Sequence, residues 1–274
     1  SFAYLVYASA WLKVRKPEDF YAGVLAAQPM GFWSPQSLVA DALRHGVRVL
    51  PADVNYSPAH ATVEQREDHR HADRSDQWEP LTPHPAVLSP LDVHDDLAVR
   101  LGLAPIRGLG ARAAQAIVTE RCAHGPYRNL ADLARRVRLS RSRLEALAAS
   151  GALDSLGVER RRALWAAGVL SDEHGQCRGA SHQERGTWFQ PTLPGTAVGA
   201  VAPALPAMTS REQQAADLNL TGVSTHGSPL TSLRPGLMAD GVLTTADLSH
   251  QEHGSRVRVA GLVTHRQRPH TASG

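Results

Sequence analysis

The chain has 274 residues, of which 42% are hydrophobic and 20% are charged, and its formal net charge at pH 7 is +3. This composition is ordinary for a folded globular protein and excludes a chain that is disordered along its whole length. No stretch approaches the roughly 18 apolar residues of a membrane span, and two cysteines, Cys122 and Cys177, are too few to staple a secreted domain of this size. We therefore expect several folded modules, a cytoplasmic location and no membrane partner.

The first 57 residues predict helices followed by a short strand. Residues 1–13 place apolar side chains at helical spacing, and Pro17 begins a second helix that we expect to pack against the first. A third helix is bounded by Ser34 as its N-cap and Gly46 as its C-terminal stop. Residues 47–50 then predict a strand.

The composition changes between Tyr56 and Pro90 to acids, histidines and prolines, which predicts an insertion or a loop. The candidate metal ligands in this stretch are His60, His69, His71 and Asp73. No periodic helix or strand holds these side chains in place, so we expect no metal site.

Helical periodicity resumes at about Leu97 and continues to about Leu170. Residues 171–207 are rich in Gly, Ala, Pro, Ser and Thr, which predicts a linker. A short helix is then predicted over Thr209–Leu220, with Thr209 or Ser210 as its cap and Glu212 in its first turns.

Apolar residues alternate with others from Val257 to Val263, which predicts the first strand of a β-domain. The chain opens with Ser1 instead of Met and stops soon after this strand. We therefore expect it to be a fragment of a longer protein.

Positive charge is concentrated in the middle of the chain. From Arg100 to Arg162 there are 13 arginines and five acidic residues, so this basic segment has a surplus of eight positive charges and the rest of the chain is net negative. Such a block is typical of a surface that contacts nucleic acid. The alternative is a solvated arginine-rich helical face, and a GC-rich genome would by itself favour arginine over lysine.

The strongest motif lies within the basic segment, in residues 103–118 (LAPIRGLGARAAQAIV), whose apolar positions and paired glycines match the helix-hairpin-helix pattern. Gly108 and Gly110 allow a tight turn, and the following helix presents unpaired N–H groups and the positive end of its dipole. A phosphate oxygen fits such a corner, and Arg107 and Arg112 are placed to add charge. These contacts hold a nucleic-acid backbone and read no bases. The alternative is a compact packing corner.

A second unit follows. Leu139–Ala149 predicts a helix with Ser140 as its cap, residues 150–153 a turn, and Val158–Val169 another helix. The turn lacks paired glycines and resembles a degenerate copy of the first hairpin. Arginines near both helix starts favour a tandem pair on one duplex, although cations there oppose the helix dipole unless they meet an anion.

The predicted DNA contacts come from the first hairpin and from the arginines that follow it. They are Arg107, Gly108, Leu109, Gly110, Ala111, Arg112, Arg128, Arg135, Arg136, Arg138, Arg141, Arg143, Arg160 and Arg161. We assign no catalytic residue and no metal ligand. Asp19, Asp41 and Asp53 fall at a helix start, a helix face and a turn, where capping and solubility are the expected roles.

Several separate segments resemble the large subunit of bacterial C-family replicative DNA polymerases, in the order that the family has them. They are residues 1–13 (SFAYLVYASAWLK), 28–35 (QPMGFWSP), 41–55 (DALRHGVRVLPADVN), the first hairpin and residues 150–157 (SGALDSLG). The QPMGFWSP stretch, residues 209–235 and residues 257–274 resemble the error-prone, ImuC-type branch.

The resemblance implies a mainly α fold, with helical fingers and a tandem helix-hairpin-helix domain followed by a linker and the start of a β-domain. The implied divisions are the C-terminal part of the fingers in 1–57, an insertion in 58–96, the tandem helix-hairpin-helix DNA-binding domain in 97–170, a linker in 171–207, a connecting segment in 208–254, and the start of a truncated OB-fold in 255–274.

The family carries out template-directed nucleotidyl transfer with two Mg²⁺ ions held by palm aspartates, and the resemblance places those aspartates outside this chain. We therefore expect a part of a translesion DNA-directed DNA polymerase that is inactive by itself and binds double-stranded primer-template DNA without sequence specificity. Mg²⁺ belongs to the complete polymerase. The sliding clamp and other mutasome proteins are further expected partners.

Two other functions are alternatives to this expectation. In the first, the basic face docks an acidic partner within a mutasome, and the hairpins are packing corners. In the second, the chain is an independent nuclease or glycosylase. The second is disfavoured because no clustered acids or lysine follow the hairpin at a suitable spacing.

Overall fold

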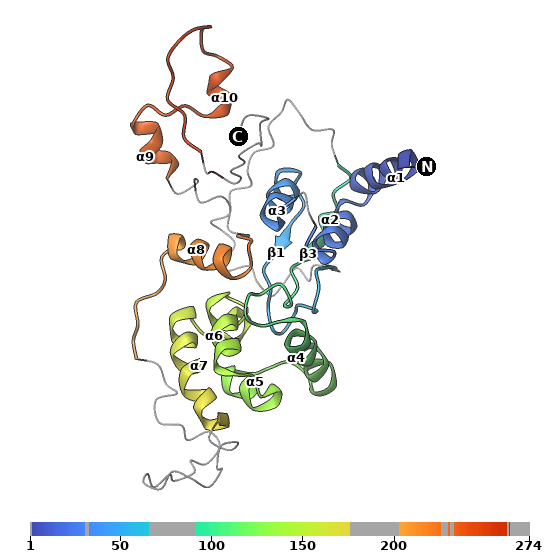
Figure 1. The fold of residues 1–274 in the computed structure, drawn as a ribbon, viewed down its shortest axis with the longest axis vertical. Helices are drawn as coiled ribbons and strands as arrows, with labels where there is room; N and C mark the ends of the chain where they lie inside the picture. Colours follow the sequence, from blue (N-terminus) through green and yellow to red (C-terminus); the bar gives the residue numbers. More distant parts are fainter. Residues whose placement is uncertain are drawn as a thin grey trace, which may run out of the picture. The chain divides into compact units, whose positions relative to one another are not determined.

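The computed structural model describes residues 2–30, 33–65, 91–175, 203–225, 230, 233–261 and 263 (Figure 1). The chain divides into two compact units, Ser1–His226 and Gly227–Gly274. Most of the described secondary structure is helical, which confirms the mainly α fold class.

The N-terminal part of the first unit combines three helices with a small sheet. The elements are α1 (Phe2–Arg15), α2 (Pro17–Ala26), α3 (Pro35–Arg44), β1 (Val49–Leu50), β2 (Thr62–Gln65) and β3 (Leu97–Arg100). The strand order is β1-β3-β2, with β1 parallel and β2 antiparallel to β3. Tyr21, Val39 and Val99 lie in a hydrophobic core that α2, α3 and the sheet share.

The predicted third helix is confirmed at its start. Ser34 is its N-cap, and the side chain of Ser34 accepts a hydrogen bond from the N–H of Ser37 at 3.1 Å. His45 ends the helix, and Gly46 follows with φ of +85°. This boundary could be predicted because cap and stop are both local signals.

The prediction that the apolar side chains of the first helix pack against the second helix is wrong. α1 forms as predicted, but none of its residues is buried, and Phe2 is 79% exposed. Two ion pairs near its C-terminal end tie it to the rest of the unit, Lys13 to Asp41 at 2.8 Å and Arg15 to Asp92 at 2.9 Å.

Both β2 and β3 differ from the sequence-based expectation. Residues 62–65 fall in the predicted loop, and Leu97–Arg100 falls where helical periodicity was expected to resume, yet both are strands. Val99 is fully buried and is in register with Val49 on one side and Val63 on the other. Strands this short carry little periodicity, and their pairing with distant residues decides their conformation.

Of the four candidate metal ligands, His69, His71 and Asp73 lie outside the described residues. His60 lies in a bend before β2 and is exposed. Within the described ranges, no group of three or more potential ligands comes together.

The second half of the first unit is a helical domain around one core. Its elements are α4 (Ala111–His124), α5 (Leu130–Val137), α6 (Arg141–Ala149), a 3-10 turn (Asp154–Leu156) and α7 (Arg160–Gly175). Leu103, Ile117, Leu133 and Leu147 are buried in this core.

Helix α8 (Ser210–Leu220) belongs to the first unit. Of the two candidate caps, Thr209 is the N-cap, and it forms a capping box with Glu212. Thr209 N donates to Glu212 Oε2 at 2.8 Å, and Glu212 N donates to Thr209 Oγ1 at 3.3 Å. The predicted connecting segment 208–254 therefore crosses from the first unit into the second.

The second unit contains α9 (Arg234–Ala239) and α10 (Thr245–Leu248). Val242 and Arg258 form a single β-bridge, and no strand is formed over residues 251–261, where Val257 and Val259 are exposed. The OB-fold assignment stays a prediction. No helix in the described parts of the chain is long and apolar enough to cross a membrane.

Candidate nucleic-acid interface

The first hairpin is a tight turn anchored by three apolar side chains. Leu103, Ile106 and Leu109 are at most 1% exposed and belong to the core of the helical domain. Ile106 N donates to Leu103 O and Leu109 N donates to Ile106 O, each at 3.1 Å. The apolar positions of the motif therefore hold the turn on the domain.

Gly108 and Gly110 have the backbone angles that the corner requires. φ is +89° at Gly108 and +79° at Gly110, a region that residues with side chains rarely adopt. Both glycines are exposed, and a Cβ added to Gly110 would meet no heavy atom within 4 Å. The corner is thus open on its outer side.

The backbone N–H groups at this corner are available to a ligand. Gly110 is the N-cap of α4, and no side chain caps that helix. The N–H groups of Gly108, Gly110 and Ala111 donate to no acceptor within the described part of the chain. They lie at or beside the positive end of the helix dipole, and this combination is typical of an anion-binding site.

The two arginines of the hairpin differ in what they contact. Arg107 faces α8, because its N–H donates to Leu220 O at 2.7 Å and its Nη1 donates to Asn219 Oδ1 at 3.3 Å. Arg112 is exposed in the first turn of α4 and lines a shallow groove, whose other wall includes Val137 of α5.

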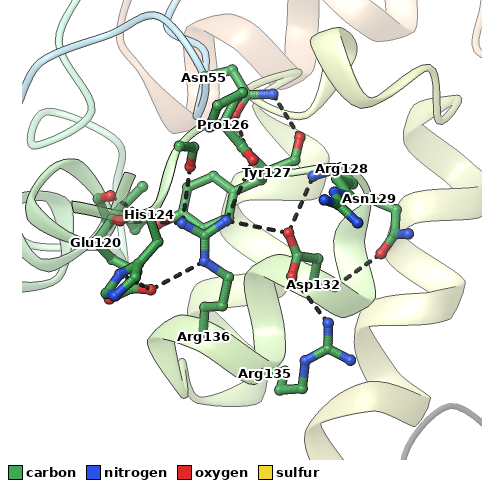
Figure 2. A network of polar contacts seen from close by, with 12 residues as sticks. Asn55, Glu120, His124, Pro126, Tyr127, Arg128, Asn129, Asp132, Arg135 and Arg136 are labelled. Atoms are coloured by element: carbon green, nitrogen blue, oxygen red, sulfur yellow. Dashed lines mark hydrogen bonds and ion pairs between the residues drawn. The ribbon is translucent and has the colours of Figure 1, made fainter. Parts of the chain in front are cut away.

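Arg136 was predicted to contact DNA, but its guanidinium is bound by groups of the chain itself (Figure 2). Its guanidinium donates to Glu120 Oε1 at 3.1 Å, to Gly125 O at 2.9 Å and to Asp132 Oδ2 at 3.3 Å, and it lies 4.4 Å from the centre of the Tyr127 ring. Burial would lower the pKa of Arg136, but the hydrogen bonds to Glu120 and Asp132 outweigh it and raise the pKa. This arginine joins α4 to α5.

Asp132 organises the start of α5 in the same network. Burial alone would raise its pKa, but hydrogen bonds from the backbone of Arg128 and from the side chains of Arg135 and Arg136 hold the pKa below its usual value. Figure 2 shows only the backbone of Arg128 joined to this network. Arg135 is paired with Asp132 at 3.0 Å and is 63% exposed.

Among the 13 arginines of the basic segment, a minority are exposed and contact no acceptor through the guanidinium in the part of the chain that the structure describes. They are Arg112, Arg128, Arg138, Arg143 and Arg162. Arg162 was not among the predicted contacts. Arg141 is paired with Glu145 at 2.8 Å.

The arginines at the start of α7 are paired with acids of α8. Arg160 Nη1 lies 2.6 Å from Asp217 Oδ1, with both side chains buried, and Arg161 Nη2 lies 2.8 Å from Glu212 Oε1. The expectation that cations at this helix start need an anion is therefore met within the chain. No local signal could predict this pairing, because the acids lie 57 and 51 residues away along the chain.

Arg121 is a further arginine with a role that sequence reasoning missed. Its Nη1 donates to Val54 O at 2.7 Å and to Ser57 O at 2.9 Å. It holds the C-terminal half of α4 on the loop that follows β1.

Comparison with known proteins agrees with this geometry. A family model described as a helix-hairpin-helix motif matches residues 46–163. Over the whole chain, proteins named error-prone DNA polymerase are 44% identical in Mycobacterium tuberculosis, 43% in Nocardia farcinica and 42% in Corynebacterium diphtheriae. The chain spans 21% of the length of each of these relatives. It is therefore similar along its entire length to about one fifth of an error-prone DNA polymerase and contains a helix-hairpin-helix motif.

Proposed function

We propose that this chain is the duplex-holding part of an error-prone DNA polymerase of the C family, ImuC-type, that copies damaged DNA. It binds the phosphodiester backbone of primer-template DNA at the first hairpin and reads no bases. The observation that carries the proposal is the open corner at Gly110, where N–H groups that have no acceptor among the described residues begin α4 beside the exposed Arg112.

The chemistry of the corner suits a phosphate. A phosphate oxygen accepts hydrogen bonds from N–H groups at a helix start, and its charge is favoured by the helix dipole. Arg112 adds a full positive charge. Because these groups recognise the backbone common to every sequence, binding is independent of base sequence and depends steeply on salt.

The chain contributes binding and not the chemical step. In the complete polymerase, Mg²⁺ would stabilise the attacking and leaving oxygens of nucleotidyl transfer. Within the described residues, the carboxylates of Asp41 and Asp53 do not fit that ion, because both already have partners. Asp41 is occupied by Lys13 and Tyr21, each at 2.8 Å, and Asp53 accepts hydrogen bonds from Asn55 N at 2.7 Å and Ser155 Oγ at 2.7 Å.

The test uses a matched pair of glycine variants and duplexes of unrelated sequence. Gly110 and Gly125 both have φ of +79°, both have open space where a Cβ would lie, and they flank the two ends of α4. Alanine strains the backbone equally at both positions, but only Gly110→Ala places a methyl group at the phosphate corner. We expect Gly110→Ala to weaken binding about tenfold, as for the loss of one charge-assisted hydrogen bond, and Gly125→Ala to leave it unchanged.

Fluorescence anisotropy of labelled duplexes measures both affinities. Equal affinities for the two variants would remove the corner from the binding site. A chain that binds an acidic protein partner instead would keep that partner in the presence of excess duplex, which the same assay detects by competition.

A further inference from the structure

We infer that only the first of the two hairpins holds DNA, because carboxylates of this same chain already fill the anion-binding positions of the second. This inference rests on the proposed function and specifies which half of the tandem unit performs it.

The two turns differ first in exposure. At the first turn Gly108 and Gly110 are exposed, whereas at the second Gly151, Ala152 and Leu153 are all buried. A Cβ on Gly110 would enter open space, but one on Gly151 would run into the guanidinium of Arg160. A phosphate therefore has direct access to the first turn and none to the second.

Within the second turn, the carbonyl oxygens of Gly151, Ala152 and Leu153 already accept hydrogen bonds from the chain. Ala152 O accepts from Val54 N at 2.9 Å. Just beyond the turn, the carboxylate of Asp53 accepts from Ser155 N at 3.1 Å and from Ser155 Oγ at 2.7 Å. A carboxylate thus receives the hydrogen bonds that a phosphate oxygen would need at this position.

The helix starts differ in the same way. α4 begins at the glycine N-cap Gly110 with no capping side chain. At α7 the carboxylate of Glu159 accepts from Arg161 N at 3.0 Å and from Arg162 N at 3.3 Å. The dipole of α7 therefore already has its negative charge, while that of α4 has none from the described residues.

The acids of α8 pair with two arginines of the second hairpin. Asp217 pairs with the buried Arg160, and Glu212 pairs with Arg161, whose Nη1 also donates to Pro206 O at 3.0 Å. A phosphate would have to displace a buried, charge-assisted pair in order to reach Arg160, and the displaced acid would repel it.

Both ends of α8 are fixed, so these acids stay in place. At the N-terminal side, Met208 N donates to Glu159 Oε1 at 3.3 Å. At the C-terminal side, Val223 is buried in the N-terminal core and Ser224 N donates to Gln36 Oε1 at 2.8 Å. The segment therefore spans from the helical domain to α3 and closes the second hairpin on the way.

The experiment compares two charge-matched variants of the full 274-residue chain, Arg112→Ala and Arg161→Ala, in duplex binding over a range of salt concentrations. Each phosphate contact contributes about −0.9 to the slope of log affinity against log salt. We expect Arg112→Ala to reduce the slope by about one. We expect Arg161→Ala to leave the slope as in the parent chain, because its partner is Glu212.

The outcomes separate the two proposals. Failure of the parent chain to bind duplex in a salt-dependent manner would refute the proposed function. If the parent chain binds duplex in a salt-dependent manner, two results would overturn the one-hairpin inference alone. In one, Arg161→Ala lowers the slope of log affinity against log salt as much as Arg112→Ala does. In the other, neither variant lowers that slope.

A measurement on the unaltered chain guards against misfolded variants. Phenylglyoxal modifies accessible guanidinium groups, and peptide mass spectrometry locates the modified arginines. We expect bound duplex to protect Arg112 and to leave the reactivity of Arg161 unchanged. Protection of Arg161 by duplex would overturn the inference.

Discussion

The side chain of Asn55 and the backbone of Tyr127 form a reciprocal pair of hydrogen bonds. Asn55 Nδ2 donates to Tyr127 O at 3.0 Å, and Tyr127 N donates to Asn55 Oδ1 at 2.7 Å. Tyr127 is itself buried, and its hydroxyl donates to Ile117 O at 2.8 Å. Burial raises the pKa of Tyr127 to about 12, so this hydroxyl keeps its proton. The pair therefore fixes the loop after β1 on the segment between α4 and α5, and the hydroxyl of Tyr127 joins that segment to α4.

The replacement Asn55→Asp should destabilise the chain. The carboxylate can still accept from Tyr127 N, but it has no N–H for Tyr127 O and it places negative charge beside that carbonyl oxygen. We expect a loss of about 2 kcal/mol in the free energy of unfolding, measured by urea denaturation followed by circular dichroism. Asn219→Asp is the control, because the side chain of Asn219 accepts from Arg107 and donates to no acceptor in the described part of the chain. A loss as large in the control would contradict this account of the Asn55 pair.

Asp41 should make the chain sensitive to acid. Burial alone would raise its pKa, but hydrogen bonds from Lys13, Tyr21 and Arg44 lower it from 3.8 to about 2. Since the folded-state pKa is the lower one, Asp41 contributes stability at pH values above its unfolded pKa. That stability is lost as the pH falls from about 4 to about 2, and it amounts to at most about 2 kcal/mol.

Urea denaturation of the parent chain and of Asp41→Asn as a function of pH checks this expectation. The difference in unfolding free energy between the two should be constant above about pH 5 and should shrink toward pH 2. Other carboxylates titrate in both chains and cancel in the difference. A difference that does not change with pH would show that Asp41 is not the titrating group.

The extent to which this fold could be predicted depends on how local each signal is. The corner at Gly108 and Gly110 and the N-cap Ser34 were predicted, and the cap of α8 was narrowed to Thr209 or Ser210. Each of these signals comes from residues that lie within a few positions of one another. The central strand β3 was missed, since Val99 takes its conformation from pairing with Val49 and Val63.

The same distinction applies to the candidate site. The sequence located the basic segment, but it could not separate an arginine that faces solvent from one that is bound by protein. Arg112 and Arg136 are both arginines of that segment, yet Arg112 is exposed while Arg136 is enclosed by Glu120 and Asp132. Only tertiary packing decides which charges remain for a ligand.

Gly102 should be intolerant of any side chain, although its backbone conformation does not require glycine. A Cβ there would lie 2.5 Å from Ala59 O and 2.6 Å from His60 Cα. Gly102→Ala must push residues 59–60 away from residue 102, just before the first hairpin. We expect a loss of about 2 kcal/mol in the free energy of unfolding. Gly23→Ala is the opposite case. Gly23 is exposed within α2 with no atom within 4 Å of the added methyl group, so we expect about 1 kcal/mol of stabilisation.

Thermal and urea denaturation of the Gly102 and Gly23 variants measure these two effects side by side. Their signs should be opposite, because one methyl group meets backbone atoms and the other meets solvent. A Gly102→Ala chain as stable as the parent would mean that residues 59–60 can move away at little cost.

Loss of one partner of the ion pair between Arg160 and Asp217 should destabilise the chain strongly, whereas replacement of both partners by apolar residues should destabilise it little. Asp217→Asn leaves a guanidinium that is 7% exposed without its carboxylate, and the expected loss in unfolding free energy is about 3 to 5 kcal/mol. The double variant Arg160→Met with Asp217→Leu replaces both charges with apolar groups and should recover most of that loss. A double-mutant cycle built from Arg160→Met, Asp217→Leu and the double variant, measured in urea, gives the coupling energy between the two side chains. If the double variant were as unstable as the sum of the single ones, the two side chains would act independently, and α8 would be held on the second hairpin by its other contacts, such as that of Glu212 with Arg161.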